Sequence, residues 1–282
     1  MGAAPTLVAA LKSAEACIDR VDARVLLGHV LSRDAAYLIT HSDVPLKPEE
    51  ASAFERLVER RVQGEPVAYL TGSREFFGRR FRVSPAVLIP RPETELVVEL
   101  ALDRLPAARQ TSVLDLGTGS GCIAISVALA RPQAAVTAAD RSREAIAVAH
   151  ENARALGAAN LRFVSSDWYS AVAGARFDLI VANPPYVAVS DRHLLEGDLR
   201  FEPRLALEAG ADGLAAIRRV VEGAPRHLAA NGWLLTEHGY DQAERVRALM
   251  RQYGLEGVFS ATDLAGIERV TGGRLTRPAT HD

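Results

Sequence analysis

The strongest constraint in the sequence is an alternation of short apolar runs and amphipathic stretches between residues 93 and 237. Strands of a buried parallel sheet are continuous apolar runs, and the helices that connect them carry apolar residues at helical spacing. We therefore expect an α/β fold with a mostly parallel sheet covered on both faces. The expected strands are residues 112–116, 135–140, 161–165, 177–182 and 233–237, and the expected helices lie near residues 93–105, 121–130, 142–156 and 214–228.

The end of the sequence departs from this alternation. The runs GVFSATDLAG and IERVTGGRL, between residues 257 and 275, are strand-like and are joined by a short loop. A parallel pair needs a crossover of a dozen or more residues, so two strands this close are expected to be antiparallel. The sequence thus predicts an antiparallel C-terminal strand pair on the parallel sheet.

The N-terminal part has a purely helical pattern. Apolar residues up to about residue 70 recur at helical spacing, as at Leu26, Leu27 and Val30, and the run FFGRRFRVSPAVLIP then alternates around Gly78. We expect a small all-α domain at residues 1–73, a β-hairpin linker at residues 74–90 and a second domain at residues 91–282. The helices carry no motif with evident chemistry, so we expect the first domain to dock a substrate.

Composition excludes several classes of protein. The formal net charge of the 282 residues is -2, so there is no overall positive field to hold a nucleic acid. The two cysteines, Cys17 and Cys122, form neither a disulfide framework nor a cluster with metal-ligand spacing, so we expect a reducing cytoplasmic setting and no metal site. No apolar run is long enough to span a bilayer, and a monomer is the expected state.

A glycine-rich turn follows the first expected strand, in VLDLGTGSGCIAIS. Ligands bind in open α/β sheets at the carboxyl ends of strands, and glycines let the backbone approach a ligand closely. A dinucleotide fingerprint has a third glycine or alanine where this sequence has Cys122, so nicotinamide and flavin cofactors are disfavoured. The candidate ligand-binding residues of the turn are Gly117, Thr118, Gly119, Ser120 and Gly121.

Acidic and aromatic residues follow the neighbouring strands. Asp140 ends the second expected strand, where a carboxylate accepts both ribose hydroxyls of an adenosine. Asp115 precedes the glycine turn. Asp167 and Trp168 follow the third strand, where a carboxylate and an indole are suited to the edge and the face of adenine. The combination predicts an adenosine-containing cofactor.

The fourth expected strand runs into Asn183-Pro184-Pro185-Tyr186 at the same edge of the sheet. Two prolines fix the backbone and remove N–H donors, so the asparagine oxygen and a backbone carbonyl are free to accept both hydrogens of a substrate –NH2 group. Tyr186 supplies a flat wall for a planar amide or base. These hydrogen bonds localise the nitrogen lone pair and orient it toward a methyl donor.

The chain resembles the release factor glutamine methyltransferase family (PrmC/HemK), and the likeness spans nearly its whole length. PVAYLTGSREFFG, VLIPRPETE, VLDLGTGSG, the strand end at Asp140, NPPYV and DLAGIERV occur in the family's order. The resemblance implies a Rossmann-like class I S-adenosylmethionine-dependent methyltransferase domain after a helical domain. It implies methylation of the N5 amide nitrogen of the glutamine in the GGQ loop of peptide-chain release factors.

The resemblance also implies roles for individual residues. Residues 117–121, Asp140, Trp168 and Asn183 are implied to contact S-adenosylmethionine, and residues 183–186 to hold the glutamine. Residues implied to close over the cleft are Arg91, Pro92, Thr94 and Glu95. One departure is His238, where the family pattern leads us to expect an apolar residue; we interpret this histidine as structural.

Two other functions remain open at this point. DNA adenine-N6 methyltransferases and other amino-methyltransferases use the same NPPY chemistry, but base flipping requires a basic groove that the slightly acidic composition disfavours. The second open function is a catalytically silent scaffold with a vestigial cofactor site. The sequence has a polar residue at every position where the cofactor site is expected to have one, which disfavours this function.

Overall fold

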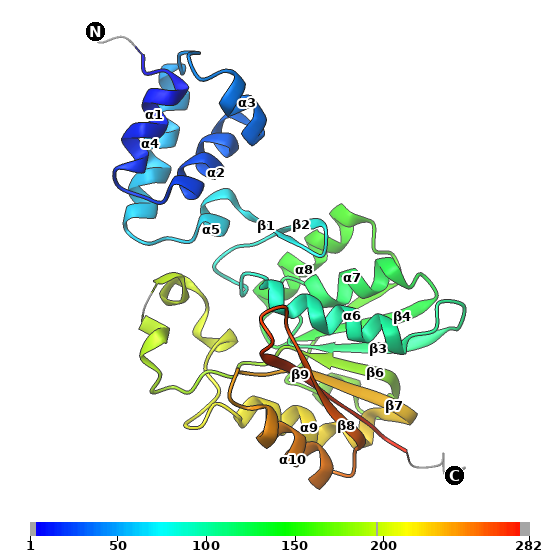
Figure 1. The fold of residues 1–282 in the computed structure, drawn as a ribbon. Helices are drawn as coiled ribbons and strands as arrows, with labels where there is room; N and C mark the ends of the chain where they lie inside the picture. Colours follow the sequence, from blue (N-terminus) through cyan, green and yellow to red (C-terminus); the bar gives the residue numbers. More distant parts are fainter. Residues whose placement is uncertain (1–3, 196, 277–282) are drawn as a thin grey trace. The chain divides into compact units, whose positions relative to one another are not determined.

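The computed structural model describes residues 4–195 and 197–276, which form two compact units. The first unit comprises the chain up to Ser73 together with a short later segment that ends at Phe201. The second comprises residues from Arg74 to Leu195 and from Glu202 onward. Figure 1 shows the helices of the first unit and the sheet of the second. No helix in the described ranges is long and apolar enough to cross a membrane.

The first unit is a small helical bundle with its own core of buried leucines, alanines and Phe54. Three of its helices begin at residues whose side chains accept a backbone N–H of the first turn, namely Thr6, Asp19 and Asp34, which are preferred helix caps. Its helices are α1 (Leu7–Glu15), α2 (Arg20–Leu31), α3 (Ala35–Thr40), α4 (Pro48–Val62) and α5 (Val67–Thr71).

A segment far along the chain belongs to this first unit. The 3-10 helix η4 (Gly197–Phe201) is held by Arg61 of α4, whose guanidinium donates to Asp22 at 2.7 Å and to Asp198 at 3.0 Å. Arg200 donates to the carbonyl of Gln63. The first unit is therefore assembled from two separate stretches of sequence, which the sequence pattern did not predict.

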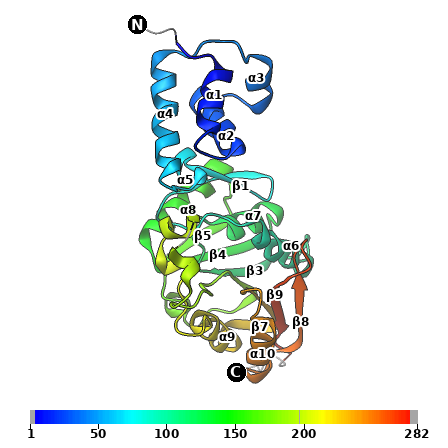
Figure 2. The same cartoon turned by 60° about the vertical axis from the view of Figure 1, so that its left-hand side comes forward.

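The second unit contains a seven-stranded sheet in the order β5-β4-β3-β6-β7-β9-β8. Strands β5, β4, β3, β6 and β7 are parallel, and β9 pairs antiparallel with both β7 and β8. Figure 2 shows β5, β4 and β3 side by side. The predicted α/β fold with an antiparallel C-terminal pair is confirmed. The bounds are β3 (Thr111–Leu116), β4 (Ala134–Asp140), β5 (Leu161–Ser165), β6 (Phe177–Ala182), β7 (Leu228–Glu237), β8 (Glu256–Thr262) and β9 (Glu268–Arg274).

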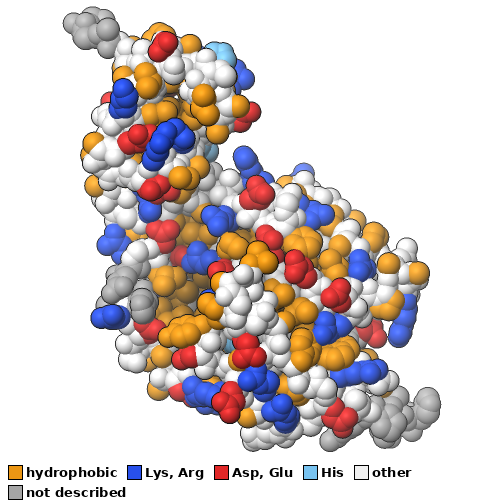
Figure 3. All heavy atoms as spheres, in the orientation of Figure 1, with side chains coloured by type: hydrophobic (Ala, Val, Ile, Leu, Met, Phe, Trp, Pro, Cys, Tyr) orange, Lys and Arg blue, Asp and Glu red, His pale blue; other side chains and the backbone are white. Residues whose placement is uncertain are grey.

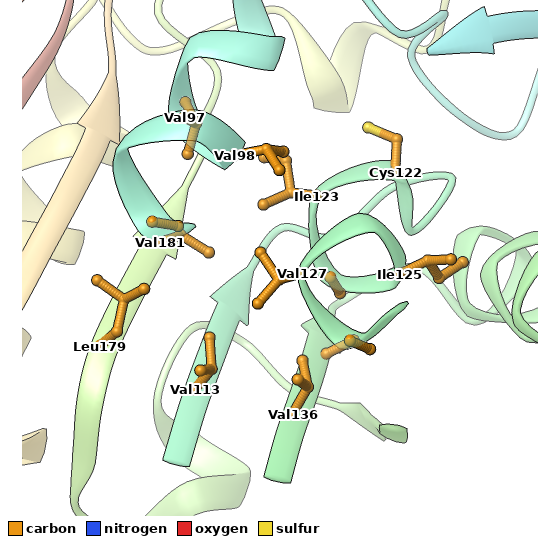
Figure 4. Packing of buried hydrophobic residues seen from close by; sticks show 14 of the residues in the cluster. Val97, Val98, Val113, Cys122, Ile123, Ile125, Val127, Val136, Leu179 and Val181 are labelled. Atoms are coloured by element: carbon orange, nitrogen blue, oxygen red, sulfur yellow. The ribbon is translucent and has the colours of Figure 1, made fainter. Parts of the chain in front are cut away.

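Helices cover both faces of this sheet. Successive strand residues point to opposite sides, and the apolar side chains on each side pack against helices. Val113 packs under helices α6 (Glu95–Arg104) and α7 (Cys122–Ala130), whereas Leu114 packs against α9 (Ala215–His227) and α10 (Ala243–Gln252) on the other face. Figure 4 shows the first of these layers, in which valines of α6 and α7 lie over β3, β4 and β6. Helix α8 (Arg143–Leu156) follows β4.

A short hairpin, β1 (Ser73–Phe76) and β2 (Arg79–Arg82), precedes the sheet. Phe76 and Phe81 are buried in the same apolar cluster as residues of α6 and α7. Asn152 of α8 accepts from the Arg82 amide at 2.7 Å and donates to the carbonyls of Arg82 and Ser120. One buried amide side chain therefore joins the hairpin to the glycine-rich turn.

Candidate active site

A cavity of about 320 Å³ opens at the carboxyl ends of β3, β4 and β6. This volume lies within the range of small-molecule sites, about 300–1,000 Å³. The structure brings together there most of the residues that the sequence singles out, from the ends of four strands, β3, β4, β5 and β6, that are far apart in the chain. The predicted residues that line the cavity are Gly117, Thr118, Gly119, Ser120, Asp140, Trp168, Asn183 and Pro185.

The glycine-rich turn has the backbone conformation that its glycines predict. Gly117, Gly119 and Gly121 all have positive φ, at 73°, 55° and 82°, which other residues adopt at a cost. Gly121 lies outside the cavity lining; a Cβ there would come within 2.8 Å of Ile125 and 3.1 Å of Ala149. Its absent side chain therefore serves the packing of α7 against α8, whereas Gly117 and Gly119 face the cavity.

Asp140 ends β4 and aims its carboxylate at the cavity. Oδ2 accepts from the Gly119 amide at 2.9 Å and Oδ1 from the Ser142 amide at 2.9 Å. Each carboxylate oxygen retains further acceptor capacity, because an ionised carboxylate offers about four lone-pair sites in total. The backbone thus fixes the carboxylate in place while leaving it able to accept two adjacent hydroxyl groups.

Asp115 supports the turn from below. It is fully buried and accepts from the Thr118 hydroxyl at 2.6 Å and from the Ala124 amide at 3.3 Å. Burial raises the pKa of its carboxyl to about 7 against these hydrogen bonds. Asp115 does not line the cavity, so we assign it to holding the turn.

Trp168 lies half-buried on the cavity wall in a left-handed conformation, φ 53°. Ser166 stabilises this turn by donating its hydroxyl to the Trp168 carbonyl at 2.7 Å. A bulky residue in this region is strained, and such strain occurs mainly where a site requires it. The neighbouring Asp167 also lines the cavity and forms an exposed ion pair with Arg219.

The tetrapeptide after β6 is held from two sides. Asn183 Nδ2 donates to the Thr94 hydroxyl at 3.1 Å, and Gln242 Nε2 donates to the Tyr186 carbonyl at 3.0 Å. Gly213 packs so closely that a Cβ would lie 2.5 Å from that same carbonyl. Asn183 and Pro185 line the cavity, whereas Pro184 and Tyr186 do not.

Tyr186 contacts β7 through its hydroxyl group and is not among the residues that line the cavity. Its hydroxyl donates to Glu237 Oε1 at 3.3 Å, and burial raises its pKa above the usual range. In the described structure the ring thus anchors the tetrapeptide. Its predicted role as a flat wall for the substrate amide remains a prediction.

Arg91 and Thr94, which the family resemblance implied to close over the cleft, both line the cavity. The Arg91 guanidinium is paired with Glu202, and Glu202 Oε2 also accepts from the Ile89 amide at 2.9 Å. Glu202 is only 4% exposed, so this acid fixes the segment before α6 beside the cavity. Glu95 accepts from the Phe77 amide at 2.7 Å, away from the cavity lining.

Sequence reasoning missed Glu202, Gln242 and Glu237. Glu237 had a detectable signal, because it ends an expected strand at the same edge as Asp140 and Asn183. Glu202 and Gln242 lie in segments without periodicity, and only the tertiary structure brings them to the tetrapeptide and its neighbours.

The interpretation of His238 as a structural residue stays a prediction, which its surroundings favour. It is fully buried, and burial lowers its pKa. The ring contacts the Gly239 carbonyl through Nδ1 at 2.9 Å and the Thr271 hydroxyl through Nε2 at 2.8 Å. A neutral ring that donates from Nδ1 and accepts at Nε2 satisfies both partners.

Comparison with known proteins shows to which family the chain belongs. Residues 6–72 match the PrmC N-terminal domain family and residues 94–196 match the methyltransferase small domain family. A release factor glutamine methyltransferase of Bordetella pertussis is 54% identical over 259 residues, covering 92% of this chain and 96% of the relative. One of Xylella fastidiosa is 51% identical over 270 residues, covering 96% and 98%. The chain belongs to the release factor glutamine methyltransferase family.

A solved methyltransferase from Pyrococcus furiosus shares the fold, with a TM-score of 0.53 at 17% identity, covering 77% of this chain and 96% of that one. As a member of the release factor glutamine methyltransferase family, this chain has S-adenosylmethionine as its cofactor. The cavity fits it: Asp140 presents free acceptor sites for a ribose, and the glycine-rich turn and Trp168 lie beside them.

Replacing Asp140 with alanine is expected to weaken S-adenosylmethionine binding by roughly 1.5–3 kcal/mol, because the ribose hydroxyls lose a charged acceptor. Calorimetry measures this. Asp140→Asn should weaken binding as well, because it removes the charge and turns an NH2 group toward the amide of Gly119 or Ser142. NADH should bind far more weakly than S-adenosylmethionine; tight NADH binding without S-adenosylmethionine binding contradicts the cofactor assignment.

Proposed function

We propose that this chain transfers a methyl group from S-adenosylmethionine to the side-chain amide nitrogen, N5, of the glutamine in the GGQ loop of peptide-chain release factors, in the cytoplasm and as a monomer. The observation that carries the proposal is the position of Asn183. Its side chain lines the cofactor cavity, and its Nδ2 is engaged by Thr94. The amide oxygen is therefore the group that Asn183 offers to a substrate.

The chemistry needs an acceptor more than a base. A glutamine –NH2 is a poor nucleophile because its lone pair is delocalised into the carbonyl. Acceptance of its hydrogens by Asn183 Oδ1 and a backbone carbonyl of the proline pair draws electron density onto nitrogen and orients it. When bound, the cofactor supplies an electrophilic methyl group on a sulfonium. The methylated amide then carries an extra proton, which it loses to water.

The rest of the site restricts how the tetrapeptide can move. Gln242 occupies the Tyr186 carbonyl, and Glu237 accepts the Tyr186 hydroxyl. With these groups engaged, Asn183 and Pro185 are the members of the tetrapeptide that face the cavity. This pre-organisation supports transfer to a planar nitrogen held in one orientation.

A protein substrate is favoured over DNA by the charge distribution. On the face drawn in Figure 3, Lys and Arg side chains are interspersed with Asp and Glu. With a net charge of -2, this pattern differs from the basic groove that a base-flipping enzyme needs. We assign the helical first unit to docking of the release factor.

Mass spectrometry of release factors incubated with the protein and labelled S-adenosylmethionine tests the function. We expect one added methyl group on the GGQ glutamine. A release factor in which alanine replaces that glutamine should remain unmodified. Methylation of adenine in DNA, or of another residue of the release factor in place of the glutamine, contradicts the proposal.

A further inference from the structure

A second carboxyl group lies beside the catalytic tetrapeptide. Glu237 is the last residue of β7, and the parallel register of β6 and β7 pairs Ala182 with Thr236. The next residue along the chain is Asn183 after β6 and Glu237 in β7. Glu237 is 1% exposed, so the fold places a buried acid directly beside the asparagine that faces the substrate.

Glu237 contacts the tetrapeptide through hydroxyl groups. Its Oε1 accepts from the Tyr186 hydroxyl at 3.3 Å, and the Thr94 hydroxyl, which lies near it, acts as a further donor that lowers the pKa of the carboxyl group. Within the described residues, Oε2 has no hydrogen-bond partner. A buried carboxylate oxygen without a hydrogen-bond partner is costly, so a role for this acid at the site is worth seeking.

The number of protons in this chain of contacts sets the orientation of Asn183. The Thr94 hydroxyl has one proton to donate. When that proton goes to the Glu237 carboxylate, Thr94 can only accept from Asn183. The asparagine must then turn its NH2 group toward Thr94, as observed, and its Oδ1 away from Thr94.

We propose that Glu237 is a positioning residue, which in its ionised form fixes the amide of Asn183, through the Thr94 hydroxyl, in the orientation that accepts the substrate –NH2. The inference rests on the proposed function and adds a residue to it. Glu237 is not among the residues that line the cavity.

Protonation of Glu237 reverses the chain of donors. A neutral carboxyl group can donate to Thr94, Thr94 then donates to Asn183 Oδ1, and the asparagine NH2 faces the substrate NH2. Two donors then meet, and neither activates the other. Activity should therefore require ionised Glu237.

The surroundings place this ionisation near neutral pH. Burial raises the pKa of Glu237 to about 7, against hydrogen bonds from Thr94 and Tyr186. The neighbouring charge of Glu93 raises it further and that of Arg269 lowers it, and the carboxylate in turn raises the pKa of the buried Cys122 thiol. The ionised fraction should fall as the pH drops below about 7.

The test is the pH dependence of kcat on an intact release factor. For the wild type, kcat should fall about tenfold per pH unit below the pKa of Glu237. Glu237→Gln keeps an acceptor oxygen that cannot titrate, so its kcat should be flat between about pH 6 and 8. Thr94→Val should lose about tenfold in kcat, the scale of one hydrogen bond, whereas Thr94→Ser, which keeps the hydroxyl, should retain activity.

The proposal is overturned if the wild-type kcat is flat below neutral pH. It is also overturned if the Glu237→Gln enzyme shows the wild-type fall of kcat at acid pH, or no methylation at any pH. A Thr94→Val enzyme with wild-type kcat overturns it as well. Calorimetric S-adenosylmethionine binding and thermal melting confirm that each variant is folded.

A readout without substrate separates this inference from the proposed function. An isotope-edited infrared titration follows the Glu237 carboxyl group directly. If Glu237 stays ionised down to about pH 5, close to the ordinary range of a glutamate, the positioning switch is wrong whatever the substrate. Absence of wild-type methylation at every pH would instead contradict the proposed function.

Discussion

Replacing Asn183 with alanine should lower kcat for release-factor methylation by at least about a hundredfold, the scale of removing one preorganised polar contact to a reacting group. Asn183 Nδ2 is bound to Thr94, so the change removes the oxygen that accepts the substrate –NH2. The fold should survive, because the side chain is half-buried at a cavity wall rather than packed in the core.

Single-turnover kinetics with saturating cofactor measures this loss. Because Asn183 also lines the cofactor cavity, S-adenosylmethionine affinity must be measured for the same variant, and kcat compared at saturation. Tyr186→Phe is the matched control in the same tetrapeptide, since it removes only the hydroxyl that contacts Glu237; it should cost less than about tenfold. A near wild-type kcat for Asn183→Ala would mean that the asparagine does not polarise the amide.

Strand positions were predictable because burial on both faces produces unbroken apolar runs. The predicted and observed strands at residues 161–165 and 177–182 coincide. The strand predicted at residues 233–237 begins earlier, at Leu228. Residues 229–232, AANG, have the composition of a turn rather than of a strand, which is why the prediction began only at residue 233. The backbone there is irregular: Asn231 has φ 64°, and the register with the partner strand shifts between Phe177 and Leu179.

Helix α10 was absent from the sequence prediction although its signal is present. Ala243, Val246 and Met250 are buried at helical spacing. The rest of the helix is strongly polar and arginine-rich, which obscures a narrow apolar stripe. The 3-10 segments between residues 192 and 206 have no such periodicity, and Asp198 of η4 is bound by Arg61, which lies 137 residues away in the sequence.

The candidate site was predictable where chemistry follows a strand end. Asp140 and Asn183 were identified on that basis, and both line the cavity. What the sequence could not supply are the contacts that orient them. Thr94 and Asn183 are 89 residues apart, and no local pattern reports which hydroxyl faces which amide. Gly121 shows the converse, because a motif position can serve helix packing rather than the ligand.

Deleting residues 1–73 should reduce kcat/KM for an intact release factor by at least about a hundredfold, equivalent to roughly 2.7 kcal/mol of contact free energy. The reason is that the first unit has its own core and carries exposed apolar side chains, such as Val21 and Ile39, yet none of the residues described in this unit lines the cofactor cavity. Its proposed contribution is therefore binding energy remote from the chemistry.

The truncation also removes Asp22 and Arg61, so Asp198 loses its ion pair, and a control for folding is needed. Methylation of a short GGQ peptide supplies it, because a peptide makes few contacts outside the catalytic cleft and should be modified at a similar slow rate by the full-length and the truncated chain. S-adenosylmethionine binding, measured by calorimetry, should also be preserved, since the residues that line the cavity all belong to the second unit. If the truncated chain keeps both activities and still methylates the intact factor at the full-length rate, the first unit does not dock the substrate.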